Sequence, residues 1–362
     1  MTGNTSLRLA PSRVLVLGAV LTLAVPGTAY ANTVSVTVKT PGATGGPASA
    51  DSEMSTHADC AGGLVSGGGI NQAVGTGAGA NGNHVNGTSP SSDSTTEYTG
   101  STGVVGTDVT HWLGIGGSGG QVNASFSTTP YAVCFTSNLI NHTQVVMNKA
   151  NTPTAGATVG RVTATCPANT RLLGGGARTT PGNTGGFKTI ASFPTFNDSA
   201  HSFGAKAAAN GKTNPDSWSA VGWDSGANGA DYTYAYAICS GGGIDVGGTT
   251  VKVRYAEVSG PTTGSTGQTA TVGCGQGDGN LVSGGAAISG GSVTTTDFTG
   301  PGSHGDHLNG SFPSDAAGTP VGDGSANPSY WTAATHSGGS PSQGSYSDVW
   351  ALCLDVQHGH KR

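Results

Sequence analysis

Charged residues are scarce in this chain. They make up 9% of its 362 residues, with 14 Lys and Arg against 19 Asp and Glu, and the formal net charge is -5. Nucleic acids and anionic lipid surfaces are bound through clustered Lys and Arg, because their phosphates attract positive charge. The sequence contains no such cluster. We therefore expect neither nucleic acid nor a membrane surface as a partner.

Long hydrophobic runs are also lacking, apart from Val14–Val25 near the start. Proline and glycine end this run, and it is shorter than the roughly 20 residues that a membrane span needs. Two arginines precede it and the small-x-small pattern Ala29-Tyr30-Ala31 follows, as in a secretory signal peptide. We predict a signal peptide over residues 1–31, no membrane insertion, and a secreted mature protein that begins near Asn32.

A sustained helical period is absent after residue 31. Short segments such as Val34–Lys39 and Val251–Tyr255 instead alternate apolar and polar residues, which is typical of half-buried β-strands. Tyr232–Cys239 places three tyrosines and an isoleucine on one face and small residues on the other. The sequence therefore predicts an all-β fold.

The sequence does contain an internal repeat. A Leu- and Gly-rich stretch follows a cysteine three times, at Leu64–Gly69, Leu172–Gly176 and Leu281–Gly285. Each copy is followed by a tryptophan and then, 22, 21 and 22 residues later, by a second cysteine. This spacing predicts three tandem β repeats of roughly 105 residues at 32–137, 138–242 and 243–356, with a flexible tail at 357–362.

Two arrangements of the repeats are compatible with this pattern. Each repeat is large enough to form its own sandwich core, which would give three beads on a string. Alternatively, three sheets surround a pseudo-threefold axis, as in a β-prism. The linkers between repeats are short, so we expect the repeats to touch.

The chain has only six cysteines, two in each repeat. In an exported protein they are expected to form disulfides, and the repeat favours the pairs Cys60–Cys134, Cys166–Cys239 and Cys274–Cys353. Each would close a long loop and stabilise the fold by about 4 kcal/mol on the chain-entropy model. A zinc site is not expected, because the short Cys-x-x-Cys spacing is missing.

Glycine recurs inside the predicted strands, where it is costly because it loses much backbone entropy and packs nothing. Its return in every copy suggests close backbone approach, a bulge, or an aromatic ring lying over it. The tryptophan of the same repeat is our candidate for that ring.

The best-preserved copy of the repeat is carried by Cys166–Gly176 and Tyr234–Cys239. Together with the Ser-Phe-Pro and Trp positions between them, it resembles a Cys/Gly-rich β repeat of exported actinobacterial and phage-associated proteins. The resemblance covers nearly all of the chain after residue 31. It implies export and a β fold, and it implies no catalytic residue.

A His-x-Asn-Gly motif occurs in the first and third repeats, whereas the second has Lys188 in place of the histidine. Asn-Gly and the downstream Pro, Ser and Asp are good turn formers, so only the histidines lack a structural explanation. On an exposed strand, these polar groups beside a tryptophan would suit a hydroxyl-rich ligand. The predicted ligand-binding residues are His84, Asn86, Asp93, Trp112, His307, Asn309, Asp315 and Trp331.

These observations favour a secreted protein that binds polysaccharide or a cell-surface glycan, with avidity from its repeats. One alternative is a polysaccharide hydrolase or lyase, whose acids would lie in one repeat or at a repeat interface. Its candidates are residues present in one copy, such as His111, His336 or Glu257, but no two-carboxylate frame is recognisable. Another alternative is a structural or adhesive protein. No cofactor or metal is expected.

Overall fold

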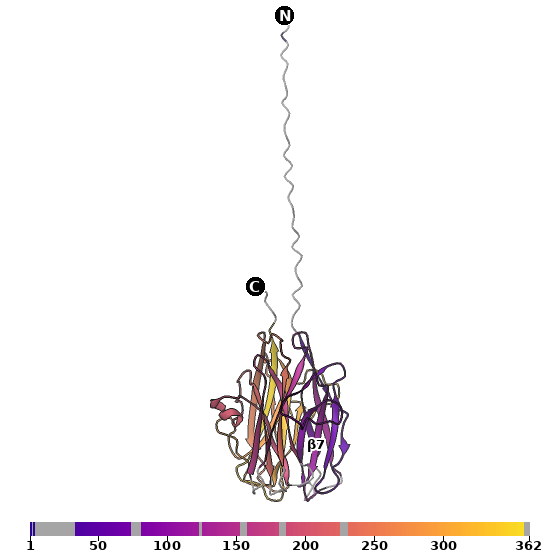
Figure 1. Cartoon of the computed structure of the whole chain (residues 1–362), viewed down its shortest axis with the longest axis vertical. Coiled ribbons are helices and arrows are strands. Elements are labelled where there is room, and N and C mark those ends of the chain that lie inside the picture. Colours follow the sequence, from indigo (N-terminus) through magenta and orange to yellow (C-terminus); the bar gives the residue numbers. More distant parts are fainter. Residues whose placement is uncertain are drawn as a thin grey trace. The chain divides into compact units, whose positions relative to one another are not determined.

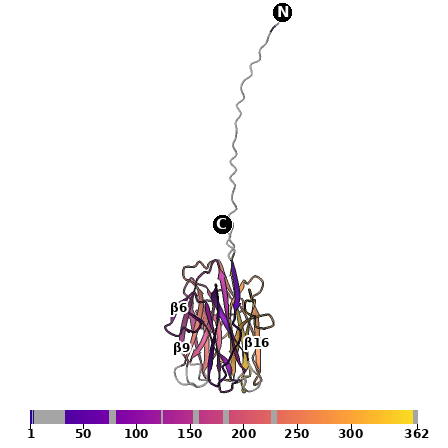
Figure 2. The same ribbon diagram turned by 90° about the vertical axis from the view of Figure 1, so that its right-hand side faces the viewer.

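The computed structural model describes residues 33–73, 81–122, 125–152, 158–180, 186–224 and 231–357, together with Met1 and Gly3. The predicted signal peptide, apart from those two residues, and all but the first residue of the predicted tail lie outside this part. Residues 32–362 form one compact unit, whose strands run side by side in both views (Figure 1, Figure 2). Among the described residues, no helix is long and apolar enough to cross a membrane.

The predicted all-β fold is confirmed, because the strands form three antiparallel sheets. The first sheet has the order β1-β8-β4-β18-β19-β16, with β2 also paired to β8. Its strands are β1 (Val34–Lys39), β2 (Thr44–Gly45), β4 (Leu64–Ala73), β8 (Ser127–Ser137), β16 (Gly267–Gly273), β18 (Asp306–Ser314) and β19 (Tyr330–Ser337).

The second sheet has the order β3-β7-β5-β11-β14-β9-β6 and the third the order β10-β13-β12-β17-β20-β15. The strands of the second are β3 (Glu53–Asp59), β5 (Asn83–Ser91), β6 (Gly103–Thr107), β7 (His111–Ser118), β9 (Thr143–Asn151), β11 (Leu172–Thr180) and β14 (Tyr232–Ser240). Those of the third are β10 (Thr158–Thr165), β12 (Phe187–Thr195), β13 (Ser217–Asp224), β15 (Thr249–Ser259), β17 (Asn280–Ser289) and β20 (Tyr346–Val356). A short 3-10 element, η2 (Ser199–Gly204), follows β12.

Each sheet is shared by two repeats. The first repeat supplies β1, β8 and β4 to the first sheet and β3, β7 and β5 to the second, and the other repeats divide in the same way. The junctions at the sheet centres are β4–β18, β5–β11 and β12–β17. Because β4, β11 and β17 contact one another, and β5, β12 and β18 do likewise, the repeats surround a pseudo-threefold axis. The prism-like arrangement is therefore the one adopted, and independent beads are excluded.

The repeated glycines allow this close packing. Each repeat has a small-residue triplet in its Leu- and Gly-rich strand. At the middle residue of this triplet, a Cβ would overlap the tryptophan ring of the same repeat, in the pairs Gly68–Trp112, Gly175–Trp218 and Gly284–Trp331. At the next position a Cβ would overlap a backbone carbonyl on the adjoining strand of another repeat, as at Gly69 and Gly176. The expectation of a ring over the glycine and that of close backbone approach are both confirmed.

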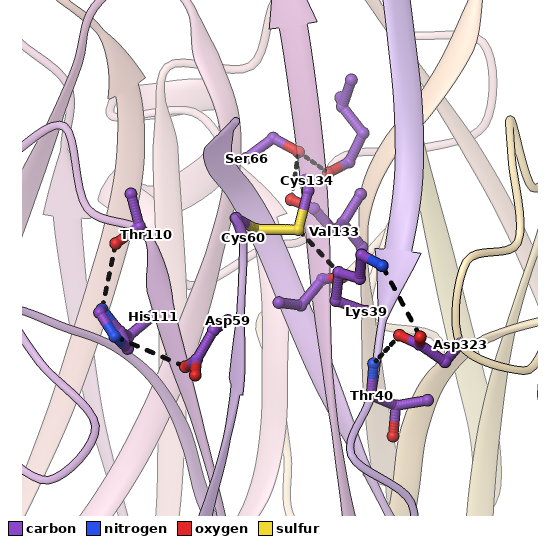
Figure 3. Close-up of a disulfide and its surroundings, with 12 residues drawn as sticks. Lys39, Thr40, Asp59, Cys60, Ser66, Thr110, His111, Val133, Cys134 and Asp323 are labelled. Atoms are coloured by element: carbon purple, nitrogen blue, oxygen red, sulfur yellow. Dashed lines mark hydrogen bonds and ion pairs between the residues drawn. A yellow bond between two sulfur atoms is a disulfide. The ribbon is translucent and has the colours of Figure 1, made fainter. Parts of the chain in front are cut away.

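The three predicted disulfides are confirmed. Each repeat contributes a group of neighbouring strands, which we call a half-sheet, to each of two sheets. Each disulfide joins the two half-sheets of one repeat. Cys60 follows β3 of the second sheet and binds Cys134 on β8 of the first, as Figure 3 shows. Nearby, the Ser66 hydroxyl donates to the carbonyl of Val282, 2.6 Å away, and so ties the first repeat to the third.

The opening strand of each repeat is clamped on its outer edge by a segment of another repeat. The clamping residue is an Asp or Asn with positive φ, a conformation that these side chains tolerate well, and it exchanges two hydrogen bonds with the strand. The pairs are Asp108 with Thr143, Asn214 with Val251, and Asn327 with Val36. β6 of the first repeat, which leads into Asp108, also pairs with β9 (Figure 2).

Candidate functional site

The tryptophans lie in the core. Trp112, Trp218 and Trp331 are each 0% exposed, and each ring is covered by a glycine of its own repeat. Trp331 Nε1 donates to the Ser311 hydroxyl. The prediction that Trp112 and Trp331 form a stacking platform for a ligand is therefore wrong, because no part of either ring is open to a ligand.

The His-x-Asn-Gly strands are also buried. His84 and Asn86 on β5 are 3% and 0% exposed, and His307 and Asn309 on β18 are each 2% exposed. All residues of β5 are buried, and all of β18 but Ser311, so neither face of these central strands is open to water. The prediction of an exposed polar strand is therefore wrong for these four residues.

The structure nevertheless brings the two histidines together. Their ring centroids are 6.4 Å apart, and Lys188, which takes the equivalent place in the second repeat, lies close enough to influence the pKa of both. We call His84, Lys188 and His307 the axial cluster. Each repeat contributes one of its side chains, so the failure of the motif in the second repeat places a cation beside two imidazoles.

Hydrogen bonds fix the tautomer of both imidazoles. Nδ1 of His84 lies 2.9 Å from the carbonyl of Gly82, and Nδ1 of His307 lies 2.7 Å from the carbonyl of Gly305. A carbonyl only accepts, so Nδ1 carries the proton and Nε2 of the neutral ring bears a lone pair. Neither Nε2 has a hydrogen-bond partner among the residues that the structure describes.

Burial opposes charge on all three side chains. It lowers the pKa of His84 to about 4, with a further contribution from the Lys188 ammonium. Burial and then Lys188 also hold the pKa of His307 well below its usual value. The pKa of Lys188 itself falls to about 8 for the same reason, although Asp306 partly offsets the effect. At neutral pH the axial cluster thus holds two neutral imidazoles and one ammonium group.

The asparagines of the motif join repeats. Asn309 Nδ2 donates to the carbonyl of Asn83 in the first repeat, 2.9 Å away. Asn86 Nδ2 donates to Glu53 Oε2 over 3.1 Å, and Glu53 in turn accepts from the buried guanidinium of Arg178. Arg178 also binds Glu97 through Nε and Nη2. The repeat pattern gave no sign of this ion-pair network, because arginine occurs at this position only in the second repeat.

Asp93 and Asp315 serve as turn residues. Asp93 accepts hydrogen bonds from the backbone of Thr95 and Thr96, which lower the pKa of its carboxyl to about 2. Asp315 accepts from the backbone of Ala317 and Thr319. These bonds are those expected of an Asp in a turn, so the turn chemistry accounts for both residues.

Glu257, the acid named for the hydrolase alternative, lies beside a buried carboxyl. Glu257 lies opposite Asp348, and the Tyr255 hydroxyl is 2.7 Å from a carboxylate oxygen of each. Asp348 is fully buried and also accepts from the Ser289 hydroxyl. Burial raises its pKa to about 7. A substrate cannot reach this carboxyl, which instead holds β15 and β17 against β20.

The other two residues of that alternative lie apart. His111 is on β7, with Nε2 3.6 Å from Asp59 and Nδ1 3.1 Å from the Thr110 hydroxyl (Figure 3). His336 packs on His307, with ring centroids 5.3 Å apart. Throughout the described part of the chain, no group of three or more His, Cys, Asp or Glu residues is placed to hold a metal ion.

A groove of about 440 Å³ lies at the corner between β9 and β10, within the second repeat. Most of its lining is polar. The lining residues are Asn148, Lys149, Ala150, Arg161, Val162, Thr163, Thr165, Asn197 and Phe203. Its volume falls within the range of small-molecule sites.

Phe203 is the most exposed aromatic side chain of the described residues, at 65%. It lies in η2, at the outer margin of the sheets in Figure 1. Its φ is 51° and that of Ser202 is 48°, a left-handed conformation that costs an ordinary residue about 1–2 kcal/mol. The fold thus keeps a bulky aromatic group in a strained, solvent-facing position, which is common at functional sites.

The neighbouring residues hold this conformation in place. Phe203 donates its backbone N–H to the Asp198 carbonyl over 2.8 Å. Gly204, with φ of 93°, lies so close to Thr163 on β10 that a Cβ there would overlap the Thr163 side chain. Ser219 on β13 donates to the Gly204 carbonyl. Glycine at this position therefore locks η2 against the sheet and leaves the Phe203 ring beside the groove.

Comparison with known proteins finds no match to a family model and no matching curated relative. The candidate site is therefore defined by its geometry alone.

Proposed function

We propose that this is an extracellular protein that binds polysaccharide or a cell-surface glycan through the groove between β9 and β10. The observation that carries the proposal is the exposed Phe203 ring beside a groove lined by amide, hydroxyl and basic side chains. The predicted ligand class is retained, whereas its site moves from the buried tryptophans and histidines to this groove.

The chemistry of sugars suits such a surface. A pyranose has apolar C–H faces that pack on an aromatic ring, and hydroxyls that need donors and acceptors at its rim. Phe203 supplies the ring, while Asn197 and Arg161, both exposed, supply polar groups at the edge of the groove. The mostly polar lining provides donors and acceptors for sugar hydroxyls, and the Phe203 ring provides the apolar contact.

An extracellular location is consistent with the covalent structure. Three disulfides and no free cysteine occur among the described residues, and disulfides persist in oxidising compartments. The signal-peptide pattern of residues 1–31 supports the same location.

The test is a polysaccharide pull-down or glycan array with residues 32–362, comparing the natural chain with Phe203→Ala. Without the ring, the apolar face of a sugar stays in water, at a cost of about 25 cal/mol per Å² left uncovered, so we expect about a tenfold loss of affinity or more. The matched control is Val104→Ala on β6, because Val104 is also exposed, at 54%, and lies outside the groove.

Unfolding midpoints of the two variants should match that of the natural chain, since neither side chain is packed. Equal binding by Phe203→Ala and Val104→Ala would reject the groove. Failure of the natural chain to bind any glycan would reject the function itself.

A further inference from the structure

The axial cluster joins all three repeats at one point. His84 lies on β5, Lys188 on β12 and His307 on β18, at equivalent positions that each precede the proline of the strand by six residues. The three side chains are 3%, 6% and 2% exposed. Any charge added here therefore acts between three separate segments of the chain in an interior where water screens little.

The cluster places two imidazoles and one ammonium group together in a buried position. Nδ1 of each histidine donates to a carbonyl, and Nε2 has no partner in the described structure. The Lys188 ammonium donates to the His304 carbonyl and lies 5.8 Å from the Trp223 ring. Among the described residues, no carboxylate is hydrogen-bonded to either Nε2. The Asn86 side chain and the Glu53 charge partly offset a proton on His84, but burial and the Lys188 ammonium oppose it more strongly.

We propose that the axial cluster is an acid-sensitive junction, in which protonation of His84 and His307 gathers three positive charges on the axis and separates β5, β12 and β18. The junction is stable with one charge, and it opens when the imidazoles are protonated. This inference is independent of the glycan groove, which lies at β9 and β10.

The neighbouring ionisable groups reinforce the effect. The Glu53 carboxylate acts on His84, but Glu53 is already ion-paired with Arg178, which also binds Glu97. Asp306 on β18 is the counter-charge of Lys188, but burial raises its pKa, so it loses its charge as the pH falls. His336 on β19 packs on His307, and burial lowers its pKa as well.

His304 also lies near the cluster. Burial and Lys188 lower its pKa, and Asp224 on β13 opposes this change. Acid therefore removes a negative charge at Asp306 and adds positive charge at the imidazoles. Glu53 and Asp224 offset this positive charge only in part, because burial and Lys188 outweigh them at His84 and His304.

The sign of the pH dependence follows from the lowered pKa values. Above about pH 6.5 the histidines are neutral in both the folded and the unfolded chain, so they add no pH dependence. Below about pH 6.5 these histidines bind protons in the unfolded chain but stay largely neutral in the folded chain, so the free energy of unfolding decreases as the pH falls. With a folded pKa of about 4 for His84, lowering the pH from 7.5 to 5 raises the unfolding equilibrium constant about 30-fold through this residue alone.

The test is urea unfolding of residues 32–362 at pH 7.5 and pH 5, for the natural chain and for His84→Gln with His307→Gln. Buried carboxyls such as Asp348 and Asp231, whose pKa values burial raises to about 7 and about 6, shift stability in the opposite direction. The informative quantity is therefore the ratio of unfolding constants between the two chains. We expect that ratio, natural over variant, to increase at least 30-fold from pH 7.5 to pH 5.

His57→Gln is the matched control, since His57 has a 42% exposed side chain on β3 and lies outside the cluster. It should leave the pH dependence as in the natural chain. Should the double variant fail to fold, Lys188→Met provides the second test, because removing one of the three charges should reduce acid sensitivity.

Hydrogen exchange locates the response. Amides of β5, β12 and β18 should exchange faster at pH 5 than at pH 7.5, after correction for intrinsic rates, and more so than those of β1 and β15 at the outer edges. A ratio that does not change with pH, or equal exchange in all strands, would overturn the proposal.

Discussion

At the scale of single residues, a glycine in each repeat packs directly against a tryptophan ring. Gly68, Gly175 and Gly284 each leave room for a ring that would overlap any Cβ. Four of the largest fully buried side chains are Trp112, Trp218, Trp331 and Trp350. A backbone without side chains is thus what allows large aromatic rings to fill the centre of three crowded sheets.

Gly175→Ala should therefore destabilise the protein strongly. The new methyl group would meet Trp218 and the carbonyl of Tyr236, and neither can withdraw without disturbing β13 or β14. We expect a loss of about 3 kcal/mol or more, at the upper end of overpacking costs, measured by urea unfolding. Gly242→Ala is the control, since nothing lies within 4 Å of a Cβ there. Equal stability of the two variants would contradict this packing.

Asp348 provides a residue-scale prediction of pH dependence. Its folded pKa of about 7 lies above the ordinary value of 3.8, so its contribution is complete below pH 3.8 and is lost as the pH rises through 7. Asp348→Asn should remove this dependence, which amounts to roughly 4 kcal/mol across the interval. In thermal unfolding, the stability of the variant relative to the natural chain should be higher at pH 8 than at pH 5. The absence of such a gain would show that Asp348 ionises freely.

The sequence predicted the contact between glycine and tryptophan but misplaced the candidate site, for one physical reason. Alternation along a strand separates two faces but does not tell whether the second face meets water. On β5 all nine residues are buried, so the histidines that looked available became part of the interior. Phe203, conversely, lies in no repeated motif, and its exposure depends on a left-handed turn that the sequence signals only through Gly204.

At the scale of elements, the sheet edges are closed by exchange between repeats. Asp108, Asn214 and Asn327 occupy equivalent places and pair with the opening strand of another repeat. Unpaired strand edges invite aggregation, and these clamps cover part of the outer edges of β9, β15 and β1. The opening strands were predicted from their alternation, whereas the clamps were not, because each is a single Asx residue in an irregular segment.

The clamp at Asn214 can be separated into its two contributions. Asn214→Ala loses the side-chain hydrogen bond to the Val251 N–H and places alanine at a φ of 53°, for a combined cost of about 2 kcal/mol. Asn214→Gly loses the same bond but tolerates the backbone conformation, so it should cost only about 1 kcal/mol. Urea unfolding gives both values. Hydrogen exchange should accelerate in β15 first, and unchanged exchange there would show that the clamp does not hold this edge.

At the scale of the whole molecule, each sheet is built from two of the repeats that the sequence predicts. Pairing within a repeat and pairing between repeats require the same alternation, so the sequence predicted three modules and a possible threefold axis but could not predict which strands meet. In the structure every sheet is completed by a neighbour at β4–β18, β5–β11 or β12–β17. The disulfides then fasten the two halves of each repeat across adjacent sheets.

A single repeat should consequently fail to fold even with its disulfide formed. In residues 138–242 alone, β11 and β12 would become open edges, and Phe193 and Tyr236 would lose core neighbours that the other repeats contribute. We expect this fragment to show no cooperative thermal transition by circular dichroism, whereas residues 32–362 unfold in one step, because both half-sheets lose the strands of the neighbouring repeats that complete them. A fragment that melts cooperatively would show that the Cys166–Cys239 bond and one repeat's own contacts suffice, and that exchange between repeats adds only to their association.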